Sequence, residues 1–139
     1  MEFKAILLTV TGAVGSIFTT LFGGWSSALT TLILCMAMDY ITGLIVAGVF
    51  KKSNKTETGA LESYAGFKGL CRKGVMLLIV LVGYRLDLVI GTSYIKDAVI
   101  IAFIANEVIS IIENAGLMGI PIPEVLKKAI DVLNDKTEA

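Results

Sequence analysis

Two carboxylic acids, Asp39 and Glu107, each lie near the middle of an apolar stretch that is long enough to cross a lipid bilayer. An ionised carboxylate in hydrocarbon is energetically costly, so each group is expected to be protonated, paired with a cation, or exposed to water inside an assembly. Groups of this kind bond one membrane helix to another or line a path for water and ions. The two residues therefore predict a membrane protein with a polar centre.

Other residues extend this polar centre along two of the expected helices. Gly43 and Ala47 follow Asp39 at four-residue steps and form a narrow face against which another helix can pack closely. The fourth apolar stretch is polar over a wide arc, which consists of Asn106, Glu107, Ser110, Glu113 and Asn114. Because one helix pair does not need so wide an arc, we expect it to line an aqueous or polar surface between subunits. For Asp39 two roles stay open, a hydrogen bond between packed helices and exposure in a pore.

The third apolar stretch carries two charges, Arg85 and Asp87. Residues two positions apart on a helix point to different sides, so this pair does not neutralise itself. The Arg85 guanidinium has two alternatives: it pairs with Asp39 or Glu107 on another helix, or it extends to the nearby outer interface. Both residues are candidates for an intramembrane polar surface.

Composition excludes several classes of protein. Of the 139 residues, 55% are hydrophobic and 17% are charged, and the mean hydropathy of +0.82 is typical of a membrane protein. The 12 basic residues balance the 12 acidic ones, so the chain lacks the positive field of a nucleic-acid-binding protein. There is no His, no glycine-rich phosphate loop and no Cys/His metal spacing. We therefore expect no enzymatic activity, no cofactor and no metal site.

Four apolar stretches are long enough to span the hydrocarbon core, at about residues 5–22, 26–50, 74–90 and 98–117. Residues 51–73 form a polar, basic segment between the second and the third. Because Lys and Arg concentrate in the cytoplasmic loops of membrane proteins, this segment and both termini are expected in the cytoplasm. The sequence thus predicts a single all-α membrane domain with four transmembrane helices.

The first apolar stretch differs from the others because small and polar residues recur along it at helical spacing. Gly12 and Ser16 lie on this face and suit close packing against another helix. The same face also allows the helix to lie in the membrane interface, which would leave three spans and put the N-terminus outside. Glu2 and the lack of a cleavage box favour a retained segment over a signal peptide.

After the fourth stretch, Gly119, Pro121 and Pro123 break the helix. Residues 124–133 then carry apolar side chains on one face and charged side chains on the other. This pattern predicts a short amphipathic helix. We expect it to lie on the inner leaflet or against a neighbouring subunit.

Four segments carry a family signature, and they occur in order along the chain. They are residues 38–43 (Met-Asp-Tyr-Ile-Thr-Gly), 68–73 (Lys-Gly-Leu-Cys-Arg-Lys), 106–114 (Asn-Glu-Val-Ile-Ser-Ile-Ile-Glu-Asn) and 119–123 (Gly-Ile-Pro-Ile-Pro). Together they resemble a family of phage holins, also described as toxin-secretion/phage-lysis holins. The similarity covers about residues 26–133, and the first apolar stretch carries no matching motif.

The resemblance implies a phage or prophage protein of the bacterial cytoplasmic membrane that forms homo-oligomers and opens lesions at a set time. An endolysin, or in some relatives a large toxin, then passes to the cell wall without required direct contact with the holin. The implied partners are further copies of the chain and the lipid bilayer, and no nucleic acid. The polar residues named above would be the candidates for lining the lesion.

Two other functions fit the residues alone. A small ion or proton channel, or a transporter subunit, would use Asp39 and Glu107 as an ion relay. A membrane scaffold would instead bind its partners through the basic segment and the terminal helix, and its synthesis would change no permeability.

Overall fold

The structure, a computed structural model, describes residues 2–138, which form helices and no strands. The helices are, in chain order, α1 (Phe3–Leu21), α2 (Ser27–Ile45), the π-helical turn η1 (Val46–Phe50) that continues α2, α3 (Ser63–Ile90), α4 (Ile95–Leu117) and α5 (Glu124–Glu138). The prediction of an all-α protein is confirmed.

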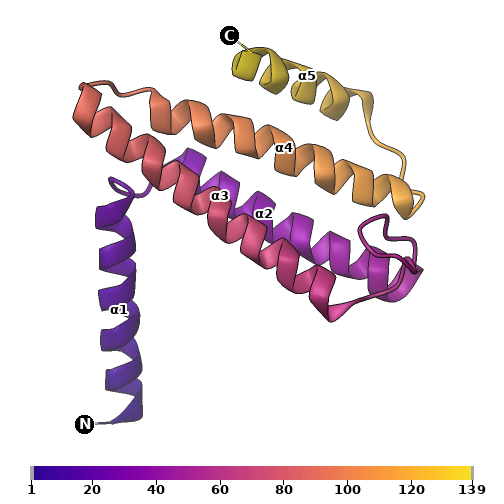
Figure 1. The fold of residues 1–139 in the computed structure, drawn as a ribbon, viewed down its shortest axis with the longest axis horizontal. Helices are drawn as coiled ribbons and strands as arrows, with labels where there is room; N and C mark the ends of the chain where they lie inside the picture. Colours follow the sequence, from indigo (N-terminus) through magenta and orange to yellow (C-terminus); the bar gives the residue numbers. More distant parts are fainter. Residues whose placement is uncertain (1, 139) are drawn as a thin grey trace.

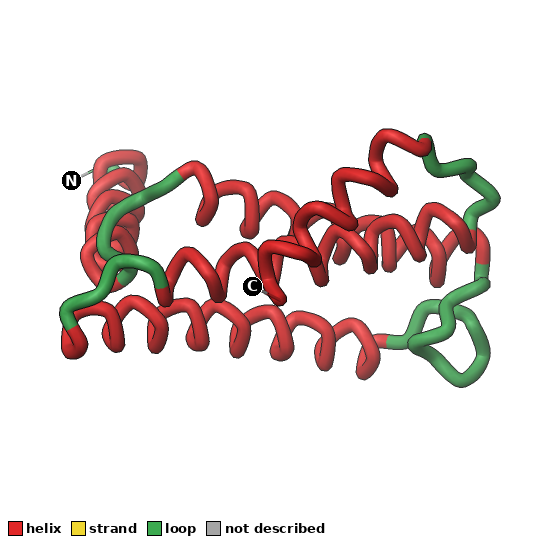
Figure 2. The backbone as a smooth tube through the Cα atoms, turned by 90° about the horizontal axis from the view of Figure 1, so that it is seen from above, coloured by secondary structure: helices red, strands yellow, loops and turns green. Residues whose placement is uncertain are grey.

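Helices α2, α3 and α4 lie side by side and form a bundle (Figure 1). Helix α4 packs along both α2 and α3, whereas α2 and α3 touch each other little. Helix α1 runs crosswise to the bundle and is seen almost end-on in the second view (Figure 2). We call the end of the bundle where residues 51–62 join α2 to α3 the loop end, and the end where residues 91–94 join α3 to α4 the turn end.

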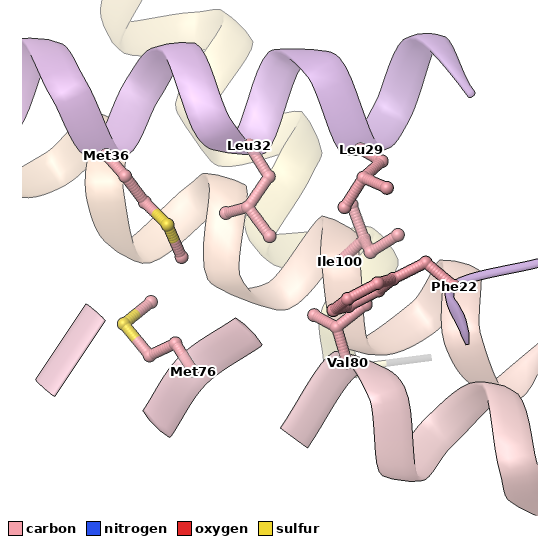
Figure 3. Close-up of a cluster of buried hydrophobic side chains, with 7 residues drawn as sticks. All are labelled: Phe22, Leu29, Leu32, Met36, Met76, Val80 and Ile100. Atoms are coloured by element: carbon pink, nitrogen blue, oxygen red, sulfur yellow. The ribbon is translucent and has the colours of Figure 1, made fainter. Parts of the chain in front are cut away.

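An apolar core fills the bundle toward the turn end (Figure 3). It consists of Phe22, Leu29, Leu32, Met36, Met76, Val80 and Ile100. Burying one such side chain stabilises a fold by about 1.5–3 kcal/mol in water. In a bilayer that stabilisation shrinks, because lipid tails are as apolar as leucine, and close packing matters instead. The core therefore joins the three helices at one end and leaves the polar residues to the other half of the bundle.

Asp87 organises the turn between α3 and α4. Its carboxylate accepts hydrogen bonds from the Thr92 hydroxyl (2.6 Å) and from the backbone N–H groups of Ile95 (3.0 Å) and Lys96 (2.9 Å). These N–H groups belong to the first turn of α4, where a helix has no acceptors of its own for them. In this structure Asp87 therefore stabilises the start of α4, just after Gly91 (φ 85°) has ended α3 in the left-handed conformation.

Helix α3 begins at Ser63, well before the apolar stretch expected from residue 74. The predicted basic segment 51–73 is therefore irregular only over residues 51–62. Hydropathy marks where the side chains become apolar, whereas the backbone hydrogen bonds of a helix form equally well beneath polar side chains. As a result, Lys73 lies inside α3, about 15 Å along the axis from its first residue.

The amphipathic helix expected at residues 124–133 is present as α5 and continues to Glu138. It folds back along α4 of its own chain (Figure 1). Ile130 and Leu133 are half-buried, whereas Val125 and Val132 are exposed. Helix α4 is thus the apolar surface on which α5 packs in this structure.

Two segments, Phe3–Leu21 and Ser27–Phe50, are long and apolar enough to cross a membrane. They correspond to the first two predicted spans. No side chain of α1 is fully buried, and apart from the contact of Phe18 with the core most of its apolar surface is exposed. The arrangement with four transmembrane helices is not confirmed and stays a prediction.

The junction between α1 and the bundle is compact. Gly23 has a φ of 74° and lies against Tyr84, so that an added Cβ would clash with the edge of the tyrosine ring. The Lys96 ammonium donates a hydrogen bond to the Phe22 carbonyl oxygen and lies 5.3 Å from the centroid of the Tyr84 ring. Gly24 has a φ of 97°, but no atom lies within 4 Å of the position of its Cβ.

These two glycines give a matched test of the junction. Both Gly23→Ala and Gly24→Ala place a side chain at positive φ, which costs about 1–2 kcal/mol. Only Gly23→Ala also clashes with Tyr84, so we expect it to lower the thermal unfolding midpoint in detergent more than Gly24→Ala does. Circular dichroism measures both midpoints, and adding Tyr84→Ala should remove the difference. Equal midpoints for the two single variants would show that the contact is absent.

Candidate functional site

Three charged side chains from three helices meet in the middle of the bundle. The Lys73 ammonium of α3 lies 2.7 Å from a carboxylate oxygen of Asp39 on α2 and 2.7 Å from a carboxylate oxygen of Glu107 on α4. Their side chains are only 14%, 8% and 4% exposed, respectively. We call these three residues the charge cluster. It joins all three helices of the bundle at a single point.

The charge cluster stabilises the closed bundle only while it is complete. Removing charges from water costs several kcal/mol per ion, and the attraction between close opposite charges offsets that cost. With all three groups ionised, two carboxylates face one ammonium, so the cluster carries one excess negative charge. A polar neighbour is therefore needed beside the carboxylates.

Asn114 is that neighbour. Its amide nitrogen lies within hydrogen-bond distance of the Asp39 carboxylate (3.2 Å), the Asp39 backbone carbonyl (3.3 Å) and the Thr42 hydroxyl (2.9 Å). Asn114 is buried, so this amide ties α4 to α2 where water does not compete. A Cβ on Gly43 would lie 3.8 Å from the same nitrogen, which shows how closely the two helices approach.

A cavity of about 610 Å³, lined by apolar side chains and by many polar and charged ones, leads from the charge cluster toward the loop end; we call it the polar cavity. Asn106, Ser110 and Glu113 of α4 line it together with Asp39 and Glu107. From the loop, the Lys55 ammonium donates a hydrogen bond to the Ser110 hydroxyl (3.3 Å). The cavity brings polar side chains of α4 and of the loop close to the charge cluster.

The structure places the other candidates from the sequence elsewhere. Arg85 and Asp87 lie on the last part of α3, near the turn end, and Asp87 is engaged in the turn. Within residues 2–138, the ion pairs of the two cluster carboxylates are with Lys73 and not with Arg85. Ser16 of α1 is exposed, and a Cβ on Gly12 would meet no atom within 4 Å. The roles assigned to these residues stay predictions.

Sequence reasoning missed Lys73, although it occurs in the second signature segment. Its charge was counted with the basic segment as a sign of cytoplasmic location. The signal that could have identified it is helical continuity, because residues 63–73 contain no proline and lead without interruption into the apolar stretch. A lysine at the start of an apolar helix faces the bundle when a neighbouring helix offers a carboxylate at the same depth.

The fold and the site together define a class of protein. The chain is a small all-helical membrane protein whose apolar helices surround an ion-paired centre. Residues 16–135 match the bacteriophage holin family, and the chain belongs to that family. The resemblance found in the signature segments is confirmed.

Several relatives cover most of the chain. An uncharacterised protein of Listeria monocytogenes is 39% identical over 124 residues, which are 88% of this chain and 83% of that protein. An uncharacterised 14.9 kDa protein of the nagH 3′ region of Clostridium perfringens is 38% identical over 126 residues, 89% of each chain. A probable holin of Bacillus phage phi105 is 29% identical over 111 residues, 79% of this chain and 76% of that protein. No solved structure matches the chain.

Proposed function

We propose that this holin subunit associates with copies of itself in the cytoplasmic membrane of a bacterial host and opens lesions that let an endolysin, or a toxin, reach the cell wall. Family membership and the similarity to a probable phage holin support this class of function. The observation that carries the mechanism is the charge cluster, because its members come from three different helices. Moving any one of these helices leaves charged groups that only water or another polar surface can stabilise.

The proposed topology has four spans and both termini in the cytoplasm. Lys51, Lys52 and Lys55 lie at the loop end, and lysines favour the cytoplasmic side of a membrane. The bundle axis then follows the membrane normal, with the turn end outside. Helix α5 leaves α4 and lies on the cytoplasmic surface, because its charged face is unfavourable in hydrocarbon.

The lesion forms, in this proposal, when the polar residues change partners. In the closed subunit, the charge cluster and Asn114 satisfy one another inside the bundle. When subunits crowd together, the helices separate and the polar arc of α4 turns toward water at the edge of a growing lesion. Asn106, Ser110 and Glu113 already line the polar cavity, so this change would extend a surface on which their polar side chains already lie together.

The proposed trigger is loss of the membrane potential. A potential of 100 mV acts on one charge moved across the membrane with about 2.3 kcal/mol, and on a partial movement with a fraction of that. Neutralising both carboxylates, Asp39→Asn with Glu107→Gln, should therefore shift the time of lysis and weaken its response to depolarising agents. Asp131→Asn, on the exposed face of α5 and outside both the spans and the cavity, serves as the control and should behave as wild type. Wild-type timing and response in the double variant would rule out this trigger.

Timed synthesis in a bacterium tests the function itself. The proposal predicts sudden release of a cytoplasmic reporter protein of the size of an endolysin. Ion-selective currents without release of protein would instead identify a channel. No change in permeability, with normal amounts of the protein in the membrane, would identify a scaffold.

A further inference from the structure

An apolar groove of about 580 Å³ runs along the bundle between α2 and α3, the two helices that touch little. Ile33, Ala37 and Ile41 of α2 form one wall, and Leu70, Gly74 and Leu77 of α3 form the other. Its lining is almost entirely apolar. The groove is distinct from the polar cavity described above, which opens at the loop end.

Lys73 lines both the groove and the polar cavity. Tyr40 lines both as well, so the groove meets the charge cluster at Lys73, beside the Tyr40 ring. If hydrocarbon filled the groove, lipid would lie against the Lys73 side chain, close to its paired ammonium, where charge is unfavourable. A helix in the groove would shield it.

Helix α1 is the segment that matches this need. None of its side chains is fully buried, and it is long and apolar enough to cross a membrane. Its threonines satisfy their own hydroxyl groups: Thr11, for example, donates to the Leu7 carbonyl oxygen (2.8 Å). Hydroxyls bonded within the helix can enter an apolar groove without losing a hydrogen bond.

The end of α1 already occupies the groove. Phe18 forms part of the groove lining, packs on the apolar core and stacks on Phe22 with 4.4 Å between ring centroids. The residues that follow, Gly23 and Gly24, both have positive φ, and space around Gly24 is open. They provide a hinge between α1 and the bundle.

We propose that, in the membrane, α1 rotates about Gly23 and Gly24 and lies in the groove between α2 and α3 of its own chain. This inference rests on the proposed function, since the four-span topology requires α1 to leave its crosswise position. The register follows from Phe18, which stays level with Leu77. Seven residues earlier, Thr11 then lies level with Leu70, because both helices rise about 1.5 Å per residue. Gly15, on the same face as Phe18, allows close approach to α3.

Disulfide formation in native membranes tests this position. The variant carries Thr11→Cys and Leu70→Cys in a chain with Cys35→Ser and Cys71→Ser, and oxidation should produce an intramolecular bond in most chains. The matched control replaces Ala13 instead of Thr11, because Ala13 lies on the opposite face of α1 and should not react. The pair Gly83→Cys and Val99→Cys, where α3 and α4 approach closely, controls for oxidation.

Each result decides the inference. An intramolecular bond for the Thr11 pair and none for the Ala13 pair supports it. A bond between two chains only would show that α1 packs on another copy, and it would overturn the inference. No bond for the Thr11 pair, when the Gly83 pair reacts, would overturn it as well and leave lipid as the groove's occupant. Reporter release from the reduced variant is measured in parallel, so failure of the proposed function is seen separately.

Discussion

Replacing Lys73 with Met is expected to make cells lyse earlier, and at a smaller amount of the protein in the membrane, than the wild-type chain does. The substitution keeps most of the side-chain volume but leaves the Asp39 and Glu107 carboxylates without their cation. Removing one partner from a buried ion pair typically costs about 3–5 kcal/mol. That loss falls on the closed bundle, so the open arrangement becomes relatively more stable. The measurement is the time of reporter release at matched protein amounts.

Two controls separate the charge cluster from a general loss of charge. Lys68→Met removes a lysine from the same helix, where the side chain is exposed and its ammonium lies 5.1 Å from the centroid of the Tyr64 ring. It should lyse on the wild-type schedule. Adding Asp39→Asn and Glu107→Gln to Lys73→Met makes the cluster neutral and should restore much of the delay, because a neutral buried cluster avoids the unpaired charges. Identical timing for Lys73→Met and Lys68→Met would contradict the account.

Exchanging the charges of Lys73 and Glu107 is expected to give the second large effect. Lys73→Glu alone puts three carboxylates together, and Glu107→Lys alone puts two ammonium groups beside one carboxylate. Both single variants should lose the closed state, either by immediate permeabilisation or by failure to accumulate. The double variant again has one cation between two carboxylates and should recover accumulation and delayed lysis in part. Recovery beyond the sum of the single effects demonstrates direct coupling, and no recovery would show that the two positions do not interact.

The acidic residues of the charge cluster could be singled out from the sequence, although their role stays a prediction. Asp39 and Glu107 were recognisable because a carboxylate in an apolar stretch needs a partner, and Asn114 because it shares a helical face with Glu107. The structure brings all three together. The cation was not recognised, since hydropathy placed Lys73 at the edge of a span and charge counting placed it in a loop.

The position of α1 could not be predicted for a different reason. A face of small residues such as Gly12 and Ser16 shows that a helix can pack closely, but it does not show against what. The crosswise direction of α1 in this structure (Figure 1) goes with the glycine turn and with the contact of Gly23 with Tyr84, which lies far away in sequence. The role of Asp87 could not be predicted from the sequence either. The sequence shows that Asp87 lies two residues after Arg85, but its hydrogen bonds to the start of α4 depend on how the turn folds.

The central claim is that the helices of the bundle must separate before a lesion opens. A reversible disulfide bond between two of these helices tests it most directly. A Cβ on Gly83 of α3 would lie 3.5 Å from a Val99 methyl group of α4, far from the charge cluster. Cysteines at these two positions, in a chain without Cys35 and Cys71, should form a disulfide that holds α3 against α4. The account predicts that oxidised cells retain the reporter protein and release it soon after a membrane-permeant reductant is added, while each single cysteine variant releases it on schedule. Release on schedule from fully oxidised protein would contradict the account.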